Sequence, residues 1–330
     1  MNLAASRIAI VGVTGVVGRE ILAILESLAV PPSAILPLAS PKSVGTRIPY
    51  SGSSIEVREA TPQSFVGCRI ALFASSSAVA RELAPHAVEA GATVIDNSSE
   101  FRMRPGIPLV VPEINGRSAL RASPAPKVIA NPNCSTIILL TAIDPLRDAF
   151  GLRSVHVATY QAVSGAGRAG LDALKAESEA AVRDGSPARA QDSPFVEPCF
   201  FNVFSHNSAV DPSTGLNGEE RKIIDESRKI LGLPDLELTP TCVRVPVERA
   251  HSQAISLRLE HKATEAQVRE AYAAHAQSDV IRIVDDRAGN RFPTPLKAAG
   301  QDPVLVGRIR PDPAHQAVVR AQVAKPKASP

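Results

Sequence analysis

The 330-residue sequence has no tryptophan, only three tyrosines and only four cysteines. The cysteines, Cys68, Cys134, Cys199 and Cys242, are far apart and form no CxxC pair, which argues against a zinc site and a redox pair and suits a reducing compartment. No stretch approaches the ~20 apolar residues of a membrane span, and the N-terminal residues lack the regions of a secretory signal. We therefore expect a cytoplasmic protein with no metal site and no membrane partner.

A large excess of charge is also missing. The net charge is +3, with 44% hydrophobic and 21% charged residues, which is ordinary for a globular protein. No basic block is present, so the charge pattern does not favour a nucleic-acid partner. The length accommodates two domains, although a single-domain barrel is also compatible with the length alone.

Residues 7–133 alternate short apolar runs with amphipathic segments. The expected strands are 7–12, 34–40, 69–74, 92–99 and 127–130, and the expected helices are 16–28 and 77–91. This alternation predicts an α/β domain, residues 1–133, with a doubly wound, Rossmann-type parallel sheet and helices on both faces.

From residue 134 onward the pattern changes to longer alternating strands and grouped helices. The expected helices are 135–150, 171–185, 218–232 and 264–276, and the expected strands are 152–163, 236–247, 252–260 and 302–310. They predict an α+β domain, residues 134–310, with a mixed or antiparallel sheet. The tail, 311–330, is rich in proline and lysine and is expected to be weakly structured, and it could return to the first domain.

The stretch "IAIVGVTGVVGREIL" places Gly12, Gly15 and Gly18 between an expected strand and an expected helix. Phosphate binding needs such a tight turn, with close backbone approach and N–H groups at a helix N-terminus. The spacing is GxxGxxG rather than GxGxxG, and glycine turns also occur in sheets that bind no nucleotide. Its position as the first strand-to-helix turn favours a nucleotide.

The turn after the second expected strand indicates which nucleotide. An NAD site usually places Asp or Glu there, against the ribose 2′-hydroxyl. This chain has Ser40, Lys42 and Ser43 instead. A cation with two hydroxyls suits a 2′-phosphate and therefore NADP, although a solvated loop is the more common place for a single lysine.

The stretch "KVIANPNCSTIILL" places Cys134 between an expected strand and the start of an expected helix. The positive end of the helix dipole favours the thiolate and lowers the thiol pKa below its usual ~8.5. Cysteine is also a common core residue, so this stretch alone leaves a nucleophile and a packing residue as alternatives.

Five segments decide between these alternatives: "GVTGVVG", "DNSSEFRM", "NPNCST", "YQAVSGAGRAG" and "RVPVERAHS". In this order, from residue 7 to about residue 310, the chain resembles the aspartate-semialdehyde dehydrogenase family. The resemblance implies the reversible, NADP-dependent reductive dephosphorylation of L-4-aspartyl phosphate to L-aspartate 4-semialdehyde through a Cys134 thioester. It also implies a place in aspartate-family amino-acid biosynthesis and a homodimer or homotetramer formed through the second domain.

The resemblance assigns roles to particular residues. Cys134 matches the nucleophile, His251 the acid/base residue and Gln161 a residue that orients the substrate. The substrate-binding matches are Arg244 for the carboxylate, Arg102 and Lys222 for the phosphate, Asn133 and Ser99 as supporting donors, and Glu219 for the amine. The cofactor-binding residues are Gly12, Thr14, Gly15, Val16, Val17, Gly18, Ser40, Lys42, Ser43, Ser75, Ser164 and Gly165.

Each role has a simpler alternative. For Arg102, Lys222 and Glu219 it is a solvated surface charge, and for Ser164 and Gly165 it is a plain turn. Arg244 differs, because it lies in the apolar stretch "TCVRVPV", where an unpaired arginine is costly. The other six histidines lack a catalytic context, and the other three cysteines are assigned to packing.

Two departures from the family bear on cofactor binding. Residues 74–77 read Ala-Ser-Ser-Ser where the family usually carries adjacent glycines, so their side chains either crowd the cofactor or donate to it. Beyond residue 310 we find no match to the helix that returns to the first domain in the family, nor to its asparagine beside the nicotinamide.

Two other functions are compatible with the sequence. N-acetyl-glutamyl-phosphate reductase shares the chemistry, but its substrate lacks a free amine and is one methylene longer. A non-catalytic dimeric paralogue is suggested by the altered tail and serine loop, although the intact set of Cys134, Gln161, Arg244 and His251 argues against it.

Overall fold

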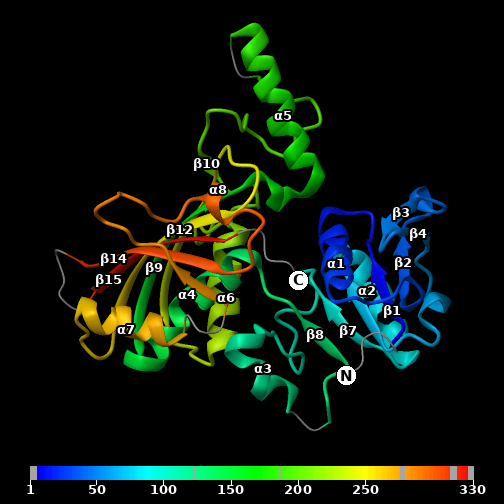
Figure 1. Ribbon diagram of the computed structural model, residues 1–330, viewed down its shortest axis with the longest axis horizontal. Coiled ribbons are helices and arrows are strands. Elements are labelled where there is room, and N and C mark those ends of the chain that lie inside the picture. Colours follow the sequence, from blue (N-terminus) through cyan, green and yellow to red (C-terminus); the bar gives the residue numbers. More distant parts are fainter. Residues whose placement is uncertain (1–5, 122–123, 186–187, 276–278, 313–317, 326–330) are drawn as a thin grey trace. The chain divides into compact units, whose positions relative to one another are not determined.

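The structure is a computed structural model that describes residues 6–121, 124–185, 188–275, 279–312 and 318–325. The chain divides between Asn133 and Cys134 into two compact units, which are described separately below. Figure 1 shows both units and the labels of their helices and strands.

The first unit is built on a six-stranded parallel sheet. Its strands are β1 (Ile8–Val11), β2 (Ile35–Ala39), β5 (Arg58–Glu59), β6 (Ile70–Phe73), β7 (Thr93–Asp96) and β8 (Val128–Ala130). They lie in the order β5-β2-β1-β6-β7-β8, which reverses direction at β1 and is the doubly wound order. The predicted Rossmann-type fold class is confirmed. All four residues of β1 are buried, as expected for a central parallel strand.

The helices of this unit are α1 (Val16–Ser27), α2 (Ser77–Glu89) and α3 (Pro112–Leu120), with 3-10 turns η2 (Pro32–Ala34), η3 (Pro41–Ser43) and η4 (Pro62–Phe65). Helix α1 buries Ile21, Leu22 and Leu25, which recur at helical spacing. Helix α3 and a hairpin of β3 (Arg47–Tyr50) and β4 (Ser53–Glu56) were not predicted from the sequence. The hairpin turn is Ser51-Gly52, both at positive φ, which is the usual two-residue geometry.

The second unit contains a seven-stranded mixed sheet, as predicted. Its strands are β9 (Leu152–Gln161), β10 (Phe204–Ser205), β11 (Glu237–Arg244), β12 (His251–Leu259), β13 (Ile281–Ile283), β14 (Val304–Pro311) and β15 (Val318–Lys325). The order is β10-β11-β9-β12-β15-β14-β13, in which β11 with β9 and β13 with β14 are parallel pairs and the others are antiparallel.

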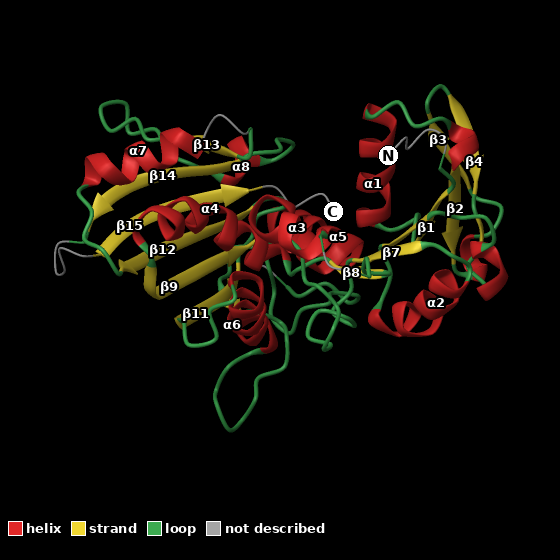
Figure 2. Ribbon diagram, turned by 90° about the horizontal axis from the view of Figure 1, so that it is seen from below, coloured by secondary structure: helices red, strands yellow, loops and turns green. Residues whose placement is uncertain are grey.

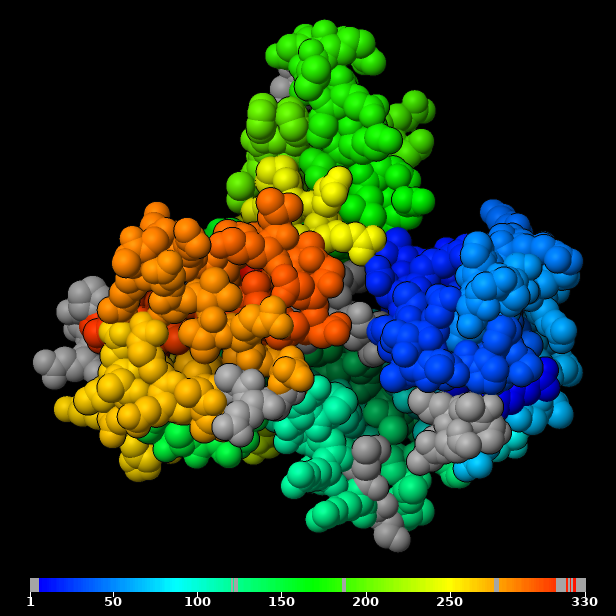
Figure 3. All heavy atoms as spheres, in the orientation of Figure 1, coloured from blue at the N-terminus to red at the C-terminus, as the bar shows by residue number. Residues whose placement is uncertain are grey.

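The helices of the second unit are α4 (Cys134–Phe150), α5 (Gly167–Asp184), α6 (Gly218–Leu231), α7 (Glu265–His275) and α8 (Pro295–Ala298), with the 3-10 turn η5 (Val163–Ala166). Figure 2 shows α4 lying along the sheet, where it contacts β9, β12, β14 and β15. Most of α4 is buried, because the sheet, α6 and α7 surround it. Helix α5 lies at the surface of this unit (Figure 3) and ends in an exposed last turn, where Val182 is 86% exposed.

The expectation of a weakly structured tail is wrong for residues 318–325. These residues form β15, which pairs with β12 on one side and β14 on the other. Val319, Ala321 and Val323 are buried, since alternate residues of a strand point to the same face. We overlooked this period of two because of the nearby prolines and lysines. The rest of the tail beyond Asp312 lies outside the described residues.

Candidate active site

Cys134 is the first residue of α4, so the predicted helix start is confirmed. The first turn of α4 contains no acidic side chain, and Ser135 and Thr136 are buried. A sulfur at this position lies at the positive end of the helix dipole, beside backbone N–H groups that have no carbonyl partner within the helix.

Three predicted residues lie together at one edge of the second sheet. Gln161 ends β9 and Arg244 ends β11, and the parallel register of these strands pairs them directly. His251 begins β12, where the next residue, Ser252, pairs with Tyr160 of β9. Gln161, Arg244 and His251 are each at most 1% exposed. The sheet therefore assembles residues that are up to 90 positions apart in the sequence.

The peptide groups on either side of Ala162 connect two of these side chains. The Ala162 N–H donates to His251 Nδ1 at 3.0 Å, and Arg244 Nη1 donates to the Ala162 carbonyl at 2.6 Å. Because Nδ1 accepts a hydrogen bond, a neutral His251 ring carries its proton on Nε2. The geometry thus selects one tautomer of this histidine.

Gly165, on η5, lies so close to Arg244 and His251 that a larger residue does not fit without a shift of these side chains. A Cβ atom at position 165 would lie 3.0 Å from Arg244 Nη1 and 3.4 Å from His251 Cε1. The glycine predicted to approach the nicotinamide therefore packs against the guanidinium and the imidazole. Its neighbour Ser164 is buried.

The guanidinium of Arg244 has further partners that the sequence analysis did not identify. Its Nη2 atom contacts His206 Nε2 at 2.9 Å and donates to Asn207 Oδ1 at 2.8 Å. The guanidinium also lies over the aromatic ring of Phe195, with 5.4 Å between its central carbon and the ring centroid. Burial lowers the pKa of Arg244, and the charges of Cys134 and Glu219 oppose that shift. His206, one of the six histidines given no role from the sequence, therefore contacts a residue of the candidate site.

No pattern in the sequence indicates a role for His206. The short strand β10 precedes it and pairs with the end of β11, so that Phe204 lies opposite Arg244. A two-residue strand has no detectable periodicity, and only the strand pairing brings residue 206 to residue 244.

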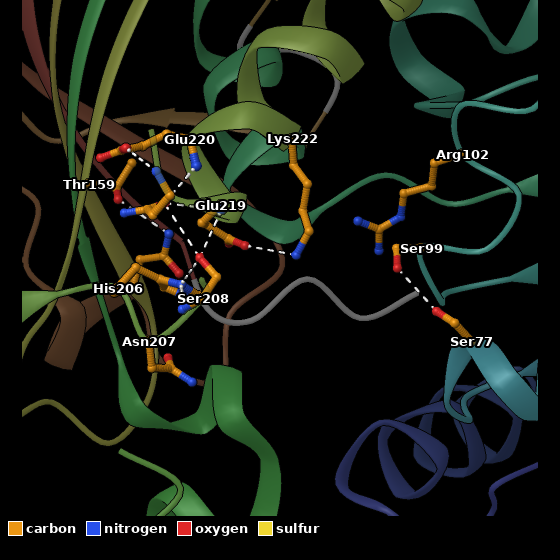
Figure 4. Close-up of polar contacts among 12 residues, drawn as sticks. Ser77, Ser99, Arg102, Thr159, His206, Asn207, Ser208, Glu219, Glu220 and Lys222 are labelled. Atoms are coloured by element: carbon orange, nitrogen blue, oxygen red, sulfur yellow. Dashed lines mark hydrogen bonds and ion pairs between the residues drawn. The ribbon is translucent and has the colours of Figure 1, made fainter. Parts of the chain in front are cut away.

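Figure 4 shows how His206 connects to α6. Ser208 Oγ lies 3.1 Å from His206 Nδ1 and accepts the backbone N–H of Glu219 at 3.0 Å. Asn217 caps α6, and Glu220 completes the capping box. Glu219 is 3% exposed, and its carboxylate pairs with Lys222 at 3.2 Å. Glu219 and Lys222 therefore share one face at the start of α6.

The other three cysteines are packed in the interior. Cys68, Cys199 and Cys242 are each at most 3% exposed, and no disulfide joins any of the four cysteines. Burial raises the pKa of the Cys68 thiol and raises the pKa values of Cys199 and Cys242 to about 12. These thiols stay protonated at neutral pH, which agrees with their assignment to packing.

In the first unit, the predicted glycine loop joins β1 to α1. Gly12 has φ +87°, and a Cβ there would lie 2.5 Å from the Ala74 carbonyl oxygen. A Cβ at Gly18 would lie 2.6 Å from Val13 Cα. Gly15 is the N-cap of α1, and no side chain caps this helix end. Glycine is therefore required by backbone contacts at Gly12 and Gly18, and the N–H groups at the start of α1 remain available to an anion.

The predicted specificity residues follow β2 at the same edge of the sheet. Gly12 and Val13 both donate their N–H groups to the Leu38 carbonyl, which holds the turn after β2 beside the glycine loop. In this turn, Ser40 and Lys42 are exposed and Ser43 is partly exposed. A lysine at this position can reach a phosphate without losing a protein partner.

The remaining first-unit predictions follow β6, β7 and β8. Ser75 has a buried hydroxyl without a protein hydrogen-bond partner, and Ser99 Oγ lies 3.1 Å from Ser77 Oγ (Figure 4). Arg102 is 8% exposed and donates to the Asn97 carbonyl at 2.8 Å. Asn133, after β8, is buried. All of these residues lie beyond the carboxyl ends of the parallel strands, where ligands bind in sheets of this kind.

The first unit therefore fits a dinucleotide. It has a tight glycine loop, an uncapped helix N-terminus and an exposed lysine, and the buried Ser75 hydroxyl faces the same edge of the sheet. Among the described residues, no cluster of three or more His, Cys, Asp or Glu side chains can hold a metal, and no helix is long and apolar enough to cross a membrane.

A doubly wound sheet with a phosphate-type loop and a second domain with a cysteine at a helix start define a class of two-domain dehydrogenases. Two family models match the chain: the NAD binding domain of semialdehyde dehydrogenases over residues 7–123 and their dimerisation domain over residues 143–325. The chain belongs to the aspartate-semialdehyde dehydrogenase family.

Individual relatives support this membership. The chain is 40% identical to the aspartate-semialdehyde dehydrogenase of Synechocystis sp., with 94% of this chain and 88% of the relative covered. It is 37% identical to that of Bacillus subtilis, with 92% and 88% covered. The crystal structure of aspartate semialdehyde dehydrogenase II from Vibrio cholerae matches with a TM-score of 0.89, 36% identity and 97% and 93% coverage, and the same enzyme has been solved complexed with ASA.

Proposed function

We propose that this protein catalyses the reversible, NADP-dependent reductive dephosphorylation of L-4-aspartyl phosphate to L-aspartate 4-semialdehyde. The observation that carries the proposal is the convergence of Gln161, Arg244 and His251 at one sheet edge, within electrostatic range of Cys134 at the start of α4. The names of the relatives, and the ASA complex of one of them, support the choice of substrate.

Cys134 is the proposed nucleophile. Its thiolate attacks the acyl carbon, the carbon–oxygen bond to phosphate breaks, and phosphate leaves with that electron pair, so that a thioester remains. The α4 dipole and the positive charge of Arg244 both favour the thiolate. When bound, the nicotinamide cofactor would supply the hydride that converts the thioester to the aldehyde level.

His251 is the proposed acid/base residue, and its tautomer defines how it acts. With Nδ1 occupied by the Ala162 N–H, the proton available to the reaction is on Nε2. We propose that Nε2–H donates to the substrate oxygen as that oxygen becomes negatively charged. The ring takes this proton back as the carbon–sulfur bond breaks, which releases the aldehyde and restores the Cys134 thiolate. Gln161, whose Nε2 atom is held by Thr159 Oγ1 at 3.3 Å, orients the acyl group without adding charge.

Charged side chains are proposed to bind the two anionic groups of the substrate. Arg244 is proposed for the carboxylate, because it is a buried cation whose position is fixed by hydrogen bonds. Glu219 is proposed for the amine. Lys222 and Arg102 are proposed for the phosphate, with Ser99 and Asn133 as donors.

NADP is proposed as the cofactor on the basis of the loop after β2. Gly12, Thr14, Gly15, Val16, Val17 and Gly18 would hold the pyrophosphate at the start of α1. Lys42 with Ser40 and Ser43 would hold the 2′-phosphate. Ser75 would donate to the cofactor through its buried hydroxyl, and Ser164 and Gly165 would lie near the nicotinamide.

A homodimer or homotetramer is proposed, formed through the second unit. The matching model is a dimerisation domain. An open groove on the sheet is lined largely by residues of β9, β11 and β12, among them His156, Tyr160 and Thr241, and Tyr160 is 42% exposed. This large, partly exposed sheet surface is suited to contact with a second copy of the chain.

The test is phosphate-dependent reduction of NADP with L-aspartate 4-semialdehyde, measured at 340 nm. The same assay with N-acetyl-glutamate 5-semialdehyde separates the two reductases, since only the aspartyl substrate has a free amine for Glu219. Cofactor titration separates an enzyme from a non-catalytic paralogue. No turnover of either aldehyde, together with no NADPH binding at millimolar concentration, would show that the proposal is wrong.

A further inference from the structure

The segment 206–208 contributes side chains to the candidate site, although the family resemblance assigned it no role. The pairing of β10 with β11 places this segment there. The backbone N–H of His206 donates to the Cys242 carbonyl at 2.9 Å. The His206 backbone is therefore fixed to the strand that carries Arg244. This attachment makes His206 a rigid partner for the guanidinium.

The His206 side chain acts as a hydrogen-bond acceptor toward Arg244. A guanidinium can only donate, so His206 Nε2 must accept at the 2.9 Å contact. On the other side of the ring, Nδ1 lies 3.1 Å from Ser208 Oγ and 3.2 Å from the Ser208 backbone nitrogen, and Ser208 Oγ accepts the Glu219 N–H. Burial lowers the pKa of His206 to about 4, so the ring is neutral at pH 7 and keeps this acceptor role beside a cation.

Asn207 accepts the second hydrogen bond that Arg244 Nη2 donates. Its Oδ1 atom accepts from Arg244 Nη2 at 2.8 Å, and the residue is exposed, whereas His206 is largely buried. Both Nη2 protons are thus used within the protein. A carboxylate that binds this guanidinium through two parallel hydrogen bonds, one of them from Nη2, must replace one acceptor, and the exposed amide exchanges with the smaller loss of packing.

We propose that His206 is a positioning residue that orients the Arg244 guanidinium. The Asn207 amide oxygen accepts a hydrogen bond from the same guanidinium in the absence of substrate, and the substrate carboxylate replaces this amide oxygen when it binds. This inference rests on the proposed function, in which Arg244 binds the carboxylate of the substrate. The His206 contact persists when substrate is bound, and the Asn207 contact does not.

Substitution of His206 tests the positioning role. His206→Leu is expected to raise KM for the semialdehyde about tenfold or more, because a hydrogen bond to a buried charge is lost, with a much smaller change in kcat. KM for phosphate and for NADP stays the same. His206→Gln restores most of the lost affinity, since its amide oxygen can accept where Nε2 accepts. His261→Leu, an exposed histidine of the same unit, is the matched control.

Substitution of Asn207 tests the exchange. Asn207→Ala removes the competing acceptor and is expected to lower KM for the semialdehyde a few-fold, whereas Asn207→Asp pairs with Arg244 and raises it. An unchanged or higher KM in Asn207→Ala would overturn the exchange. A semialdehyde KM that is unchanged in His206→Leu would overturn the positioning role.

Crystal structures of the His206 variants provide a measurement that does not depend on turnover. The Arg244 guanidinium is expected to keep its orientation in His206→Gln and to rotate in His206→Leu. An unmoved guanidinium in His206→Leu overturns the inference even if no substrate is turned over. An inactive wild-type protein whose guanidinium moves as expected would count against the proposed function alone.

Discussion

The two units contribute different kinds of groups to the candidate site. In the first unit the proposed cofactor loop is mostly backbone: a glycine loop and a helix end, with the exposed side chain of Lys42 beside them. In the second unit it consists of buried side chains, Gln161, Arg244 and His251, tied together around Ala162. Binding a phosphate needs shape and N–H groups, whereas bond-breaking chemistry needs charges and protons in fixed places.

This difference predicts how each unit responds to mutation. Backbone sites fail when a Cβ atom is added, while the exposed side chains around them contribute little individually. Buried side-chain sites fail when a single functional group is removed, because its partners are left without hydrogen bonds.

The largest expected effect is at Cys134 in the second unit. Cys134→Ala removes the nucleophile and is expected to lower kcat by about 10⁴-fold or more. The matched control is Cys68→Ala, a buried cysteine of the first unit, which should keep most of the activity. The measurement is phosphate-dependent NADP reduction, and substantial turnover by Cys134→Ala would remove this residue from the mechanism.

The second prediction concerns the stability of the buried cluster as a function of pH. His206 has a pKa of about 4 in the folded protein and about 6.5 when unfolded, so the unfolded chain binds more protons between these values. Its contribution is complete above pH 6.5 and is lost as the pH falls toward 4, by up to about 3 kcal/mol. Burial is the main cause, and the charges of Glu219, Arg244 and Lys222 also act on the ring.

Urea unfolding of the wild type and of His206→Gln between pH 4 and pH 7.5 measures this contribution. Glutamine does not titrate, so the free energy of unfolding of the variant should fall less steeply below pH 6.5. Parallel curves for the two proteins would mean that the histidine is protonated in the folded state at pH 6.

The third prediction tests the backbone character of the first unit. Gly12→Ala introduces a Cβ atom 2.5 Å from the Ala74 carbonyl oxygen at a residue with φ +87°. We expect NADPH affinity to fall by roughly tenfold or more, with a lower Tm, because both the strain and the contact displace the loop. Gly45→Ala is the matched control, since Gly45 has φ +82° and no atom within 4 Å of its Cβ position.

Fluorescence titration with NADPH and thermal unfolding distinguish the two variants. Gly45→Ala carries the strain of positive φ without the close contact and should bind NADPH normally. Equal losses in both variants would show that close backbone approach at Gly12 is unimportant.

The smallest expected effect is at Lys42. Lys42→Ala is expected to weaken NADP binding by roughly three- to tenfold and to leave NAD binding unchanged, because an exposed ion pair contributes about 1 kcal/mol. Lys127→Ala is the control, an exposed lysine before β8 at the opposite, amino-terminal edge of the sheet. An equal loss of affinity for NADP and NAD in Lys42→Ala would show that Lys42 does not bind the 2′-phosphate.

Much of the fold could be predicted because its signals are local. Apolar runs alternating with amphipathic helices indicated the doubly wound sheet, and the helix start at Cys134 lies in a short stretch. The strands that were not predicted were also missed for local reasons. Strand β15 was hidden by flanking prolines and lysines, and the β3–β4 hairpin was too short and polar to show a clear apolar period.

The sequence by itself determined which residue types are available and where helices and strands begin, because these depend on neighbours within a few positions. Only the tertiary structure decided that His206 and Asn207 contact Arg244, that His251 carries its proton on Nε2, and that the tail contributes β15. Those features arise from strand pairing between distant segments, and burial and hydrogen bonding then set the protonation states.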